Sequence, residues 1–66
     1  MSPEKMVTMA NQIAAFFDTQ PGDAPERIAA HLKDYWEPRM REQLKSYVAQ
    51  GGAGLRPSVR QAAQSL

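Results

Sequence analysis

Residues 6–17 read MVTMANQIAAFF, a run that contains no charged side chain. Its apolar residues recur at intervals of three and four, the spacing of one face of an α-helix. Ser2 is a good N-cap and Pro3 suits the first helical position, while QPGD at 20–23 reads as a turn. We therefore predict a helix over about residues 3–18. The apolar residues of its face are Met6, Met9, Ala10, Ile13, Phe16 and Phe17.

A second helix is predicted over about residues 24–36. Asp23 and Glu26 lie three residues apart and resemble a capping box at its start. Pro38 disfavours helical geometry at Glu37, so the helix should end just before that residue.

Two more helices follow. The third, over about residues 38–49, has an apolar stripe formed by Met40, Leu44, Tyr47 and Val48 and ends at two glycines, Gly51 and Gly52. Ion pairs across one turn should stabilise it, and these are Glu37 with Arg41 and Glu42 with Lys45. The fourth, over about residues 57–64, is short and has a weak apolar face.

Together these segments predict an all-α fold, with residues 1–66 forming a single helical domain. The first three helices should pack as a small bundle, and the short C-terminal helix docks either on that bundle or on a partner. A chain of 66 residues buries only about 60% of its unfolded surface. Since it has no cysteine to form a disulfide, assembly with another protein is an expected source of stability.

Charge and hydropathy exclude several functional classes. Eight basic and seven acidic residues are interspersed and give a net charge of +1, without the basic excess that nucleic-acid binding requires. No segment approaches the roughly 20 apolar residues of a transmembrane helix. Glu4 lies where a signal peptide would carry basic residues. We expect a soluble, cytoplasmic protein that binds neither nucleic acid nor membrane.

No catalytic, cofactor-binding or metal-binding residue is predicted. His31 is the only histidine, and beside Ile28 and Leu32 it is best explained as a partly buried or capping side chain. A metal site needs further ligands at short spacing. The serines have no nearby base, and the glycines at 51–54 lack the strand and helix of a dinucleotide-binding loop. The chain is therefore not expected to be an enzyme in its own right.

Two segments instead have the composition of a protein interface. The uncharged run 6–17 offers neutral amides that can satisfy hydrogen bonds at a contact, and residues 35–41 (YWEPRMR) gather the residue types enriched at interfaces. Both segments can also be explained as core, and for Trp36 alone the core is favoured. Arg39 can contact either a partner or a backbone carbonyl. The predicted partner-binding residues are Met9, Asn11, Gln12, Ile13, Phe16, Phe17, Trp36, Pro38, Arg39 and Met40.

The order and spacing of four blocks carry a family resemblance. The blocks are Met9–Ile13 followed by Phe16 and Phe17, then Ile28–His31, then Trp36–Met40, and finally Gly54 and Leu55 with Pro57 and Val59. In this order they resemble the delta subunit of soluble NAD-dependent formate dehydrogenase, a molybdenum- or tungsten-containing enzyme. The resemblance covers about residues 5–63. Arg56 departs from it, since such sequences often have a small capping residue at this position.

The resemblance implies a place in a complex that oxidises formate to carbon dioxide and reduces NAD. In that family the alpha subunit carries a molybdenum or tungsten pterin and iron–sulphur clusters. The beta and gamma subunits carry FMN and further clusters. The delta subunit has no cofactor and no assigned catalytic residue, which implies an accessory role in which it binds the alpha subunit to support assembly or stability.

Three alternatives remain open. The chain can act transiently, as a maturation factor during cofactor insertion into the alpha subunit. It can also form a homodimer through the uncharged helix. A helix-turn-helix domain that presents Arg39, Arg41 and Lys45 to DNA is the third, and the balanced charge argues against it.

Overall fold

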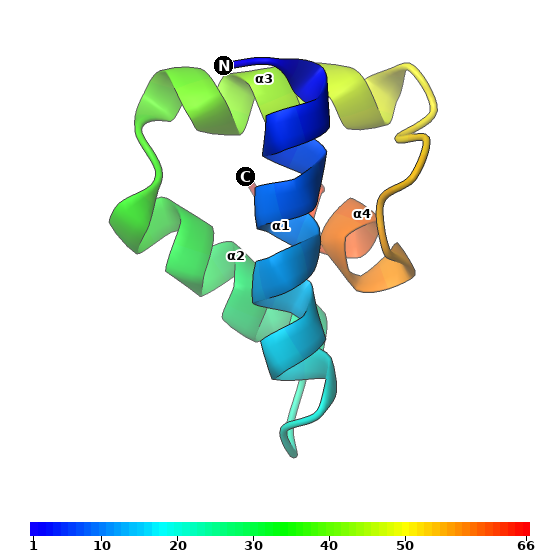
Figure 1. Ribbon diagram of the computed structural model, residues 1–66. Helices are drawn as coiled ribbons and strands as arrows, with labels where there is room; N and C mark the ends of the chain where they lie inside the picture. Colours follow the sequence, from blue (N-terminus) through cyan, green and yellow to red (C-terminus); the bar gives the residue numbers. More distant parts are fainter.

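The computed structural model describes all 66 residues and contains four helices and no strand. The helices are α1 (Pro3–Asp18), α2 (Ala24–Tyr35), α3 (Pro38–Ala49) and α4 (Pro57–Ala63), as Figure 1 shows. The predicted all-α class is confirmed, and the predicted bounds differ by one residue, at the ends of α2 and α4. No helix of the four combines the length and the hydropathy that crossing a bilayer requires.

Local sequence signals explain where the helices begin. Ser2 Oγ accepts a hydrogen bond from the Lys5 N–H at 3.2 Å, and Asp23 Oδ1 accepts one from the Glu26 N–H at 3.2 Å. These bonds satisfy backbone donors that have no partner within the first turn. Every helix has a proline at one of its first two positions, and α3 and α4 begin without a side-chain cap.

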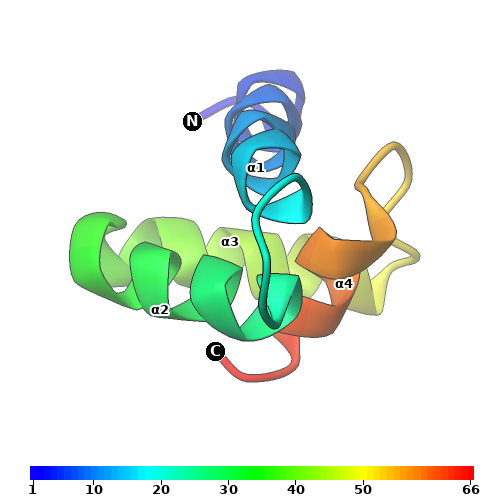
Figure 2. The same ribbon diagram turned by 90° about the horizontal axis from the view of Figure 1, so that it is seen from below.

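The core lies where α1 crosses the other three helices, which are grouped on one side of it (Figure 2). Its side chains are Met6, Ala10 and Ala14 from α1, Ile28, Ala29 and Leu32 from α2, Leu44 from α3, Val59, Ala62 and Ala63 from α4, and Trp36 and Leu55 from the connections. The fourth helix docks on the bundle, and its contact with α2 is the most extensive between any two helices. The C-terminal helix is therefore an integral part of the core.

The buried stripe of α1 differs from the predicted apolar face. Met6, Ala10 and Ala14 are fully buried at intervals of four residues, whereas Ile13 is half-buried and Phe16 is exposed. Alanine side chains let the α1 backbone approach its neighbours closely, so larger residues on the same helix are displaced to the edges of the contact. Ala14 belongs to the buried stripe although the predicted face did not include it.

Arg41 connects the end of α2 to α3. Its Nη1 donates to the backbone carbonyls of Leu32 at 3.4 Å, Lys33 at 3.3 Å and Trp36. Carbonyls at a helix C-terminus lack partners within the helix and carry partial negative charge, so they attract a cation. The predicted ion pair of Glu37 with Arg41 is wrong, because the guanidinium is used for these carbonyls instead.

The remaining predictions for α3 are confirmed. Lys45 Nζ lies 3.4 Å from Glu42 Oε1. Gly52 donates its N–H to the Tyr47 carbonyl at 3.0 Å and Gly51 donates to Val48 at 3.0 Å, the bond pattern of a Schellman motif. Gly52 has a φ of +63°, a conformation that glycine adopts without steric cost.

Asn11 attaches α1 to the connection that precedes α4. Its Nδ2 donates to the Gly54 carbonyl at 2.9 Å, and its Oδ1 accepts the Arg56 N–H at 3.0 Å. Near the end of α1, Asp18 Oδ2 accepts the Ser58 hydroxyl at 3.1 Å and lies 3.4 Å from Arg56 Nη1. These polar contacts fix the start of α4 against α1 although Arg56 provides no cap.

Replacing Arg41 by alanine is expected to lower the free energy of unfolding by about 1–2 kcal/mol, because several carbonyls at the end of α2 lose a charged donor. Urea unfolding followed by circular dichroism measures this change. Arg39→Ala is the matched control, since Arg39 is exposed on the same helix and none of the side-chain hydrogen bonds involves it. Equal effects of the two substitutions would contradict the role given to Arg41.

Asn11→Ala is expected to cost about 1–2 kcal/mol of unfolding free energy, since it leaves one carbonyl and one N–H without their partner. The neighbouring Gln12→Ala, at an exposed position, should change stability by less than about 0.5 kcal/mol. Thermal melts of both variants test the difference. A Gln12 variant as unstable as the Asn11 variant would show that the bridge contributes nothing specific.

Candidate docking surface

The ten predicted partner-binding residues fall into three groups. Trp36 is only 6% exposed and belongs to the core, and the Asn11 amide is occupied by Gly54 and Arg56. The half-buried residues pack against the core and keep an exposed edge. They are Met9, Ile13, Phe17 and Met40. The exposed residues are Gln12, Phe16, Pro38 and Arg39.

Between Met6 and Phe17 the outer face of α1 is uncharged. Thr8, Gln12 and Phe16 are exposed at successive turns, and no charged residue lies between Lys5 and Asp18. The exposed residues of α2 include four charged side chains, namely Glu26, Arg27, Lys33 and Asp34. A surface helix normally carries such charges on its outer face. The outer face of α1 is therefore the part of the surface that differs most from an ordinary solvated helix.

Four rings form an aromatic row across α1 and α2. The ring centroids of Phe16 and Phe17 are 5.2 Å apart, those of Phe17 and His31 5.9 Å, and those of His31 and Tyr35 4.7 Å. The first two pairs are edge-to-face, with interplanar angles of 79° and 64°, a favourable arrangement of ring quadrupoles. Phe16 is 59% exposed and Tyr35 75% exposed, so both ends of the row face solvent.

The aromatic row connects the two segments that the sequence identified. Phe16 and Phe17 belong to the uncharged run, and Tyr35 precedes Trp36 at the far end of α2 from the α1–α2 turn (Figure 1). Tyr35 and His31 are missing from the predicted partner-binding residues. Their spacing of four residues places both on one face of α2, and only the packing of α2 against α1 shows that this face continues the row.

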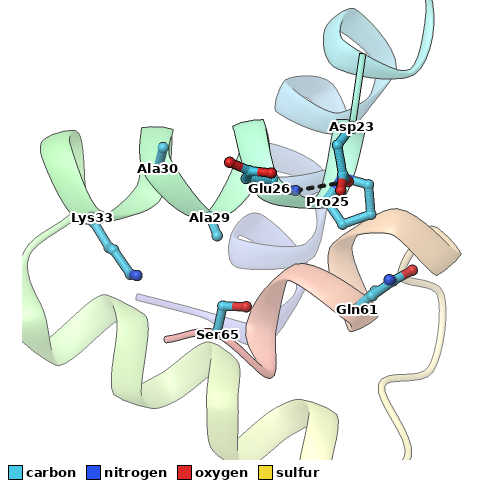
Figure 3. Close-up of a pocket in the computed structure, with 8 residues that line it drawn as sticks. All are labelled: Asp23, Pro25, Glu26, Ala29, Ala30, Lys33, Gln61 and Ser65. Atoms are coloured by element: carbon cyan, nitrogen blue, oxygen red, sulfur yellow. Dashed lines mark hydrogen bonds between the residues drawn. The ribbon is translucent and has the colours of Figure 1, made fainter.

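The largest hollow lies between α2 and α4 with the residues that follow it, and has a volume of about 500 Å³ (Figure 3). Asp23, Pro25, Glu26, Ala29, Ala30, Lys33, Gln61 and Ser65 line it. The bond drawn in Figure 3 is the one by which Asp23 caps α2. Ligand sites are usually enclosed and mostly apolar. This hollow differs from such sites because the charged residues Asp23, Glu26 and Lys33 line it. No group of three or more His, Cys, Asp or Glu side chains is placed to hold a metal ion.

One of two comparisons with known proteins gives a match, and it agrees with the sequence resemblance. A search of curated proteins finds no match. The family model described as NADH-dependent formate dehydrogenase delta subunit, FdsD, matches residues 5–63. The matched region runs from the first turn of α1 to the last residue of α4 and so includes the whole core. The chain therefore belongs to the family of the NADH-dependent formate dehydrogenase delta subunit.

Proposed function

We propose that this chain is a non-catalytic accessory subunit of a formate dehydrogenase complex. In this proposal it binds the large catalytic alpha subunit and supports the assembly or stability of the complex, which also contains beta and gamma subunits. Family membership over residues 5–63 supports a role in such a complex. The uncharged outer face of α1 is the single observation that supports docking.

In this proposal the other subunits carry out the redox chemistry. They would carry the molybdenum or tungsten pterin, the iron–sulphur clusters, the FMN and the NAD site. This chain would contribute apolar surface and neutral hydrogen-bonding groups. A subunit of 66 residues gains most of its binding energy from a few buried anchors, and exposed aromatic side chains are typical anchors.

The docking surface is proposed to include the exposed edge of α1 and the α2–α3 junction. On α1 the available side chains are Gln12 and Phe16, with the edges of Met9, Ile13 and Phe17. At the junction they are Pro38 and Arg39, with the edge of Met40. Trp36 and Asn11 would contribute indirectly, since they hold the backbone of these two segments in place.

Omitting this chain from a co-expression of the alpha, beta and gamma subunits is expected to reduce the yield of intact complex severalfold. Formate-dependent NAD reduction per intact complex should stay the same, because this chain holds no reacting group. Size-exclusion chromatography with mass spectrometry and an activity assay measure the two quantities. An unchanged yield of intact complex would contradict the accessory role.

The same experiment distinguishes the maturation role. A factor needed only during cofactor insertion would leave the alpha subunit assembled but deficient in molybdenum or tungsten, and the factor itself would be absent from the active complex. A permanent subunit is retained with a fixed stoichiometry in the complex that shows activity. Metal content per alpha subunit therefore separates the two roles independently of the yield.

A further inference from the structure

We propose that the aromatic row of Phe16, Phe17, His31 and Tyr35 is the contact surface for an uncharged, apolar face of a partner subunit. This inference rests on the proposed function, because it names the surface through which the accessory subunit binds. It also narrows that surface to one side of the molecule, where α1 and α2 meet.

The aromatic row is exposed at both ends, and its rings pack against one another. The chain exposes three large hydrophobic side chains, and two of them, Phe16 and Tyr35, are the ends of the row. The third is Met1, at the chain terminus. Because each ring contacts the next, the side chains are already ordered before a partner binds, and less conformational entropy is lost in the complex. A partner therefore meets a preformed apolar surface.

Charge determines what kind of partner fits. The α1 residues around the row are uncharged from Met6 to Phe17. Asp18 is engaged with Arg56 and Ser58, while Arg27 and Asp34 of α2 are exposed beside the row, the Arg27 guanidinium close to Gly22. These charges flank the rings, so a partner charge buried over the phenylalanine rings would lose its hydration without meeting an opposite charge, which is unfavourable. The complementary face is therefore uncharged as well.

Area indicates how far the contact extends. A stable protein interface buries roughly 800 Å² on each side, and the chain exposes 4203 Å² in total. The contact would therefore cover about a fifth of the surface (800 divided by 4203). Four rings alone do not supply this area, so the contact continues along α1 over Gln12 and Thr8, whose neutral groups provide hydrogen bonds at the rim.

The test introduces charge at the two exposed ends of the row. The double variant Phe16→Lys/Tyr35→Lys is co-expressed with the other subunits, the alpha subunit carries an affinity tag, and mass spectrometry measures how much of this chain is retained per alpha subunit. We expect at least about a tenfold loss of retention. Phe16→Leu/Tyr35→Phe, which keeps the apolar surface, should be retained like the wild type.

Gln50→Lys/Gln64→Lys is the matched control. It adds the same charge at exposed positions outside the row and should leave retention unchanged. Circular dichroism verifies that all variants are folded. If the lysine variant of the row is retained like the wild type, the row is not the contact, although the proposed function stands. If the wild-type chain itself is not retained, the proposed function fails and this inference fails with it.

Two further measurements test the chemistry of the partner. An uncharged contact keeps its retention when salt rises from about 0.05 to about 0.5 M, whereas an ionic contact is screened. Loss of the wild-type chain at high salt would overturn the uncharged partner face. Sedimentation of the purified chain should show a monomer. A dimer dissociated by the same two lysines would identify a second copy as the occupant and overturn the proposal.

Discussion

The close approach of α1 to the other helices, through Met6, Ala10 and Ala14, determines how the four helices pack together. Because Ala10 and Ala14 have small side chains, the distance between the α1 backbone and its neighbours is short and the contact is narrow. The residues on either side of the stripe then reach the neighbouring elements, with Ile13 and Phe17 packing at one edge and Asn11 bonding the connection before α4 at the other. Because the contact is narrow, the outer half of α1 stays in solvent, and between Met6 and Phe17 this half carries no charge.

Helix positions were predictable because their signals are local. Ser2 and Asp23 form caps within one turn, and the prolines at 3, 25, 38 and 57 set the starts whatever the tertiary structure. The docking of α4 was not predictable, since its alanines have little apolar surface and become core only through the shape of α2. The rule that oppositely charged residues four apart form an ion pair fails for Arg41. Its guanidinium binds the carbonyls at the end of α2 instead of the Glu37 carboxylate.

The candidate surface was predictable only in part, and aromatic composition is the reason. Large aromatic side chains are enriched both in cores and at interfaces, so the residue types around Trp36 and Phe16 do not separate the two environments. The structure buries Trp36 in the core and exposes Phe16 on the surface. The uncharged run was informative because charge is absent over three turns. The contribution of His31 and Tyr35 depends on the relative rotation of two helices, which periodicity within one helix does not determine.

The polar bridge between Asn11 and the connection before α4 has a consequence for synthesis of the chain. It joins residues 43 and 45 positions apart, and α4 completes the buried face that α1 offers. During translation the first three helices emerge before α4, so the part of the α1 stripe that packs against α4 stays uncovered until α4 has left the ribosome. The last contacts of the core can therefore form only after α4 has been synthesised.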